Sequence, residues 1–149
     1  MGQPLAPPLC VISGGEPTVT LDSGALGLGS GLGPGLGSKP GRGGRNQELA
    51  SAAALAIEGI EGVAIFACGT DGTDGPTDAA GAVAFGDSVA LAAAAGFDAR
   101  EHLDGHDAYP LFEAIGDLIK TGPTGTNVMD LHLILVAPGD RPEGHEGGR

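Results

Sequence analysis

The sequence is poor in aromatic and basic residues. Aromatic side chains make up 3% of its 149 residues and Trp is absent, so a core must be built mainly from Ala, Leu, Val and Ile. Lys and Arg together number 7, against 19 Asp and Glu, which gives a formal net charge of −12. Because nucleic-acid-binding proteins hold phosphates with clustered cations, we expect no nucleic-acid partner. The few arginines therefore become candidates for binding a small anion.

Long apolar runs are also lacking. No stretch approaches the 18 or so apolar residues of a membrane span, and no basic segment precedes an apolar one near Met1. We therefore expect a cytoplasmic protein without a membrane partner. The sequence has two cysteines, Cys10 and Cys68, which lie in strand-like runs. We expect both to be buried thiols rather than a disulfide.

Glycine, in contrast, is abundant. Its 29 residues are about one in five of the chain, where about 7% is typical. Residues 22–40 alternate Gly with Leu, Ser and Pro, and they match neither the dinucleotide-binding nor the P-loop spacing. We expect a flexible loop there, with a functional lid as the alternative. The polar, Gly-rich tail at 138–149 is expected to be disordered.

The segment Gly69 to Asp78, GTDGTDGPTD, is the most informative. It contains three aspartates and three glycines and directly follows the apolar run Val63 to Cys68, an expected buried strand. Glycine-rich turns at the carboxyl ends of strands are common ligand sites in α/β proteins. Carboxylates there can act as a general base or bind a hard cation. The pattern indicates chemistry on a phosphate or a hydroxyl, and a purely structural turn is the alternative.

A second segment, Gly43 to Glu48, begins a helical pattern that continues to Glu58. Glycines and Arg45 at a helix start predict an anion site, with Asn46 as the helix cap. A solvated arginine is the alternative. Glu16, after two glycines, either lies in a connecting turn or marks the edge of a site.

A third segment, Thr121 to Asp130, TGPTGTNVMD, precedes the expected strand Leu131 to Val136. Its hydroxyls and amide can fix a polyol or a phosphate, whereas a plain turn would use Gly-Pro and Asn for shape alone. His102 and His106 lie four residues apart near two aspartates, as metal ligands can. Because Gly105 interrupts the segment, we favour a solvated loop followed by a helix start at Asp107.

The strand-like runs alternate with helical patterns, including a predicted helix over 87–95. Residues 79–85 fit either a strand or a helical turn. This order predicts a single three-layer α/β domain with a mixed, mostly parallel sheet and flanking helices.

The three glycine-rich segments, in this order, resemble the MOFRL family. This family is the C-terminal domain of type-2 glycerate kinases, and its bacterial members are often labelled hydroxypyruvate reductases. The resemblance covers Val11 to Val136 apart from residues 22–40. A reductase would need a nicotinamide site, and the sequence has no dinucleotide fingerprint.

The resemblance implies ATP-dependent phosphorylation of D-glycerate to 2-phosphoglycerate, with Mg²⁺. The site would lie in a cleft between this domain and a larger, nucleotide-binding N-terminal domain. By position, Arg45, Asp71 and Asn127 match the residues expected to be catalytic. Arg45 would bind the glycerate carboxylate or the transferred phosphoryl group. Asp71 would orient or deprotonate the attacking hydroxyl or hold Mg²⁺, and Asn127 would bind substrate hydroxyls. Neighbouring polar groups are expected to bind substrate, namely Gly44, Asn46, Thr70, Asp74, Thr124 and Thr126, with Asp71 and Asp74 as metal ligands.

The sequence departs from the family at two points. His106 stands where the family usually has Asn, within His106-Asp107-Ala108-Tyr109. We expect the N-terminal kinase domain, which supplies most nucleotide contacts in the family, to lie outside these 149 residues. We therefore expect a chain that is incomplete as a catalyst and needs a kinase domain in cis or as a separate chain. The alternative is a non-catalytic module that binds a small hydroxy acid or phosphate.

Overall fold

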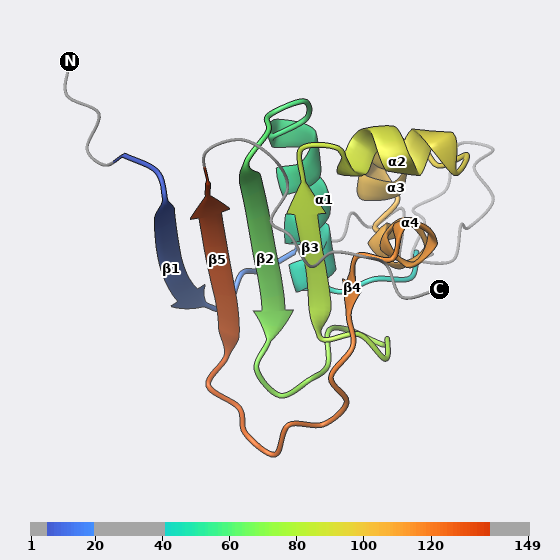
Figure 1. The fold of residues 1–149 in the computed structure, drawn as a ribbon. Helices are drawn as coiled ribbons and strands as arrows, with labels where there is room; N and C mark the ends of the chain where they lie inside the picture. The colour runs from blue at the N-terminus through green and yellow to red at the C-terminus, as the bar shows by residue number, and fades with distance from the viewer. Residues whose placement is uncertain (1–5, 20–40, 138–149) are drawn as a thin grey trace.

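The computed structural model describes residues 6–19 and 41–137 (Figure 1). The predicted loop at 22–40 and the tail at 138–149 lie outside the described residues. The described elements, in chain order, are β1 (Leu9–Gly15), α1 (Arg45–Ala56), β2 (Val63–Gly69), β3 (Gly81–Phe85), α2 (Ser88–Ala94), α3 (Ala99–Asp104), α4 (Ala108–Ile115), β4 (Leu118–Ile119) and β5 (Asp130–Val136). The ambiguous segment at 79–85 thus forms a strand, and the predicted helix near 87–95 is confirmed.

The sheet is antiparallel throughout. Its strand order is β1-β5-β2-β3-β4, and each pair of neighbours runs in opposite directions. The predicted mostly parallel sheet is therefore wrong. β1 and β2 do run in the same direction on either side of α1 in the chain, but β5 lies between them and pairs with both. An apolar run indicates that a strand is buried, and it does not reveal which strand becomes its neighbour.

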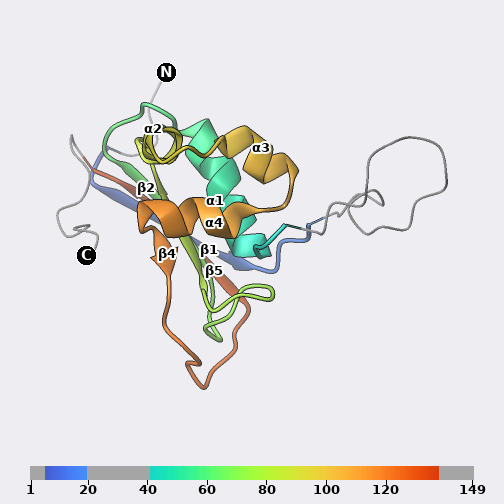
Figure 2. The same cartoon turned by 90° about the vertical axis from the view of Figure 1, so that its right-hand side faces the viewer.

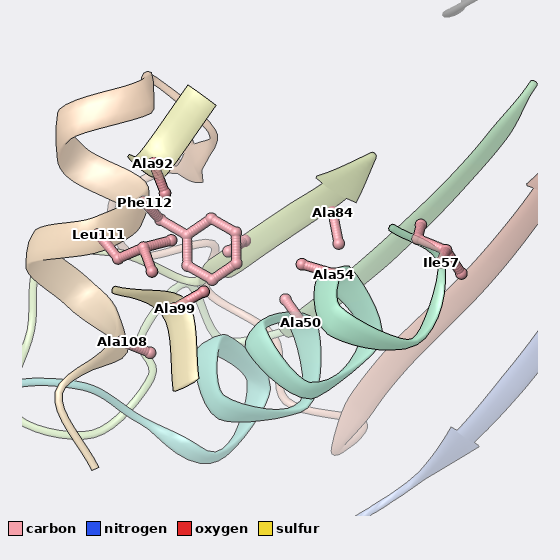
Figure 3. Packing of buried hydrophobic residues seen from close by; sticks show 10 residues of the cluster. Ala50, Ala54, Ile57, Ala84, Ala92, Ala99, Ala108, Leu111 and Phe112 are labelled. Carbon is pink, nitrogen blue, oxygen red and sulfur yellow. The ribbon is translucent and has the colours of Figure 1, made fainter. Parts of the chain in front are cut away.

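The four described helices pack on one face of the sheet, so this part of the chain has two layers rather than the predicted three (Figure 2). They share one hydrophobic cluster with the small side chains Ala82 and Ala84 of β3 (Figure 3). Phe112 of α4 is completely buried at its centre. Ala50 and Ala54 of α1 also join the cluster, and such small side chains allow a helix to approach a sheet closely. The predicted core of small residues is confirmed.

The β1–β5 edge of the sheet is much less covered. Ile12 is 69% exposed, and Val11, Ile134 and Leu135 are also exposed. β1 is thus an exposed edge strand. Cys10 is accordingly exposed, whereas Cys68 of β2 is buried, and burial raises the pKa of the Cys68 thiol. The prediction of buried thiols holds for Cys68 alone.

The three glycine-rich segments meet at one end of the sheet, the lower end in Figure 1. Gly15 at the end of β1, Asp130 at the start of β5 and Gly69 at the end of β2 lie in register across three neighbouring strands. The N-terminus of α1 lies at the same end. No helix in the described part of the chain is long and apolar enough to cross a membrane.

Candidate active site

Arg45, the first residue of α1, is fixed by a buried carboxylate. Its Nε donates to Asp130 Oδ2 at 2.6 Å and its Nη2 donates to Asp130 Oδ1 at 2.9 Å. Its Nη1 donates to Glu16 Oε1 at 3.0 Å. The side chain of Asp130 is 0% exposed, while those of Arg45 and Glu16 are 37% and 57% exposed. The guanidinium is therefore held along one edge by the buried Asp130, while its Nη1 contacts the more exposed Glu16.

The Arg45–Asp130 pair stays ionised at neutral pH. Burial alone would raise the pKa of Asp130, but the hydrogen bonds and positive charge of Arg45 outweigh it and lower that pKa. The same hydrogen bonds raise the pKa of Arg45 above its already high value. A planar guanidinium bound through two parallel N–H groups is also fixed in orientation. Arg45 thus keeps a permanently charged guanidinium in a fixed orientation, and the ion pair with Asp130 is neutral as a whole.

The carboxylate of Asp74 accepts hydrogen bonds from the N-terminus of α1. Its Oδ1 accepts from the backbone N–H of Asn46 at 3.1 Å and from Asn46 Nδ2 at 3.2 Å. Its Oδ2 accepts from the backbone N–H of Gln47 at 2.9 Å and from Gln47 Nε2 at 3.1 Å. The N-cap position belongs to Gly44, so the predicted cap by Asn46 is wrong. The anion at this helix start is the chain's own carboxylate, only 3% exposed.

This arrangement bears on the expected metal ligands. A carboxylate has about four lone-pair positions, and Asp74 uses all four for N–H donors. Asp74 therefore does not fit the expected role of a Mg²⁺ ligand. Within residues 6–19 and 41–137, no group of three or more His, Cys, Asp or Glu side chains is placed to hold a metal ion.

Asp71 and Asn127 contact each other across the two loops. Asn127 Nδ2 donates to Asp71 Oδ2 at 3.2 Å, and the backbone N–H and hydroxyl of Thr73 donate to Asp71 Oδ1. The backbone N–H of Thr124 donates to the carbonyl of Asp71 at 3.1 Å. The sequence motifs around Asp71 and Asn127, far apart in the chain, thus build one surface.

Threonine hydroxyls hold the same two loops together. Thr70 Oγ1 donates to the carbonyl of Met129 at 2.7 Å and accepts from the backbone N–H of Val128 at 2.8 Å. Thr124 Oγ1 donates to the carbonyl of Thr70 at 2.5 Å, and the backbone N–H of Thr126 donates to Thr124 Oγ1. Three of the expected substrate-binding residues, Thr70, Thr124 and Thr126, thus contribute hydrogen bonds to the shape of the loops.

The pairs Arg45–Asp130 and Asp71–Asn127 both lie near the end of β2. A β-carbon added at Gly69 would lie 3.2 Å from Asp71 Oδ1 and 3.7 Å from Asp130 Oδ1, and only 2.6 Å from the carbonyl oxygen of Thr73. Glycine at this position therefore lets Arg45–Asp130 and Asp71–Asn127 share one end of the sheet. No sequence pattern indicates that Asp130 pairs with Arg45, because the two residues are 85 positions apart. The available signal was Asp130 itself, a carboxylate directly before the apolar run Leu131 to Val136.

A comparison with protein families decides the affiliation. The model of the MOFRL family matches residues 9–130. The chain belongs to the MOFRL family. The D-glycerate 2-kinase of Thermotoga maritima is 45% identical over 134 residues, which are 90% of this chain and 28% of that protein. A protein of Agrobacterium vitis that carries the provisional name hydroxypyruvate reductase is 45% identical over 135 residues, 91% of this chain and 28% of its own.

Solved structures agree with this affiliation. The glycerate kinase of Thermotoga maritima aligns with a TM-score of 0.76 at 44% identity, over 90% of this MOFRL chain and 28% of that one. A protein of Pyrococcus horikoshii aligns with a TM-score of 0.76 at 38% identity, over 91% of this chain and 28% of its own. The chain therefore spans little more than a quarter of the length of these relatives.

The departure from the MOFRL pattern at His106 lies beside α1. His106 Nδ1 is 3.1 Å from both carboxylate oxygens of Glu48. His102 Nδ1 lies 2.9 Å from the carbonyl oxygen of Asp107 and 3.2 Å from its Oδ2. His102 belongs to α3, a helix that the sequence pattern did not predict. His106 thus links the turn after α3 to Glu48 of α1, and His102 links α3 to Asp107, the residue directly before α4.

Proposed function

We propose that this MOFRL chain supplies the glycerate side of an ATP-dependent glycerate 2-kinase site. The complete site would need a nucleotide-binding kinase domain, in the same protein or as a separate chain. One observation carries the proposal: Arg45, Asp71 and Asn127, matched to the family's active site by sequence position, gather at one end of the sheet. The names of the kinase relatives fit this role.

Arg45 would bind the carboxylate of D-glycerate. Asp130 holds its inner edge, so Nη1 is the group available to an external anion. Glu16, which occupies Nη1, is more than half exposed and makes one hydrogen bond there, so a substrate carboxylate can exchange with it. Such an exchange replaces one charge-assisted hydrogen bond with another.

Asp71 would orient the substrate hydroxyl that attacks the phosphoryl group and accept its proton. Asn127 fixes one oxygen of Asp71 and would direct the carboxylate toward the substrate. In the complete enzyme, Mg²⁺ would neutralise charge on the phosphates of ATP. Of the two aspartates expected as ligands, Asp71 alone keeps a lone-pair position free for this ion, on Oδ2.

The test is a calorimetric titration of the chain with D-glycerate. We expect weak binding, with a dissociation constant on the order of 1 mM, because half of the cleft is missing. Arg45→Lys keeps a positive charge beside Asp130 but loses the oriented Nη1, and should weaken binding at least about tenfold. Arg100→Lys, at an exposed position on α3, is the matched control and should bind as the wild type does.

Two results would count against the proposal. A folded chain that produces no heat with D-glycerate would exclude a preserved substrate half-site. Equal affinity for D-glycerate, inorganic phosphate and unrelated hydroxy acids would favour the non-catalytic binding module. A specific preference for D-glycerate, lost in Arg45→Lys, is the result that we expect.

A further inference from the structure

We propose that Tyr109 is a positioning residue that holds the three segments of the candidate site in a fixed relation. This inference rests on the proposed function for its catalytic meaning, but the contacts that carry it are independent of any substrate. Tyr109 is the second residue of α4 and is 1% exposed. Its side chain contacts the last residue of one site segment and the residues directly before the other two.

The first two links are made by the tyrosine hydroxyl. It donates to Asp78 Oδ1 at 2.6 Å and lies 3.0 Å from Glu113 Oε1. Lys120 Nζ donates to the same hydroxyl at 2.8 Å and lies 3.1 Å from Asp78 Oδ2. Asp78 ends the loop that carries Asp71, and Lys120 directly precedes the loop that carries Asn127. The Tyr109 hydroxyl thus connects the last residue of the Asp71 loop to the residue directly before the Asn127 loop.

The third link uses the aromatic ring and the backbone. The guanidinium of Arg42 stacks on the Tyr109 ring, 3.6 Å from its centroid, and the backbone N–H of Tyr109 donates to the carbonyl of Arg42 at 2.9 Å. Asp107 also holds Arg42 in place, since its Oδ1 accepts from the backbone N–H of Arg42 at 2.6 Å. Arg42 lies three residues before Arg45, so the ring fixes the approach to α1 and its guanidinium.

Without Tyr109, the charged side chains around it would hold one another only weakly. The side chains of Asp78, Lys120 and Arg42 are 61%, 41% and 51% exposed, and exposed ion pairs between mobile side chains contribute little. The hydrogen bond from Tyr109 and then that from Lys120 lower the pKa of Asp78, so its carboxylate stays charged. Because Tyr109 is buried and belongs to the same helix as the core residues Leu111 and Phe112, its hydroxyl anchors these exposed groups to α4.

The test is Tyr109→Phe, which keeps the ring and its stacking and removes only the hydroxyl. We expect hydrogen exchange, followed by NMR, to become about tenfold faster at the loop amides that close the site. These are the N–H groups of Thr70, Thr124 and Val128. Exchange in the β2–β5 ladder should change much less. Because the measurement needs no substrate, it tests the role of Tyr109 independently of the proposed kinase function.

Asp98→Ala is the control for ordinary loss of one hydrogen bond. Asp98 caps α3 by accepting from the backbone N–H of Glu101 at 2.9 Å, and this cap belongs to none of the three site segments. The variant should lower stability and leave the loop amides as protected, relative to the ladder, as in the wild type. If Tyr109→Phe accelerates loop and ladder amides in parallel, or accelerates neither, Tyr109 is not a positioning residue.

Discussion

Replacing Asp74 with Ala is expected to lower the free energy of unfolding by about 3 kcal/mol, because a buried, fourfold-bonded helix cap is removed. The backbone N–H groups of Asn46 and Gln47 would lose their acceptor, and the side-chain amide of each residue would lose one hydrogen bond. Both residues are completely buried, so water cannot easily replace the carboxylate. Urea unfolding followed by circular dichroism measures the change.

Asp71→Ala is the matched control for this variant. Asp71 lies three residues earlier in the same loop, and its hydrogen bonds are made at exposed positions. Its removal should therefore cost less than about 1 kcal/mol. Equal losses of stability in the two variants would show that Asp74 is not the structural cap that its contacts indicate.

Replacing Gly72 with Ala is expected to destabilise the chain by about 3 kcal/mol, through a close approach combined with backbone strain. Gly72 has φ +92°, and a β-carbon there would overlap the carbonyl oxygen of Gly122 in the facing loop. The loops would have to separate, which would also weaken the contact between Asp71 and Asn127. Urea unfolding gives the stability, and the NMR shifts of the Asn127 side-chain amide report the separation.

Gly125→Ala distinguishes the two causes. Gly125 has φ +75°, and a β-carbon there would meet nothing within 4 Å. This variant should carry only the strain of a left-handed alanine, about 1 kcal/mol. If Gly72→Ala and Gly125→Ala lose the same amount of stability, the loops are not packed as closely as the structure describes.

The resemblance to the family implies that the three motifs share one site, whereas their spacing along the chain does not show whether they meet. The direction of the strands could not be expected, since β5, the last strand in the sequence, lies between β1 and β2 in the sheet. The antiparallel sheet nevertheless brings Gly15, Asp130 and Gly69 to the same end. The location of the site thus follows from the motifs even though the predicted topology is wrong.

The roles of individual aspartates were harder to predict. In the sequence, Asp71 and Asp74 stand in two similar Thr-Asp-Gly triplets. In the structure, Asp74 points into the start of α1 and uses all of its lone pairs, while Asp71 faces the second loop. The difference depends on a helix that begins 29 residues before Asp74 in the chain, and so no local pattern distinguishes a helix cap from an active-site carboxylate.

The most direct measurement is the turnover of a chimera in which this chain replaces the matched part of the Thermotoga maritima D-glycerate 2-kinase. We expect ATP-dependent phosphorylation of D-glycerate, since the chain would then meet a kinase domain. Asp71→Asn in the chimera should lower kcat at least about a hundredfold. Asp104→Asn, at an exposed position on α3, should leave kcat unchanged. A folded chimera that binds ATP but transfers no phosphoryl group, or one that turns over equally well with Asp71→Asn, would contradict the account.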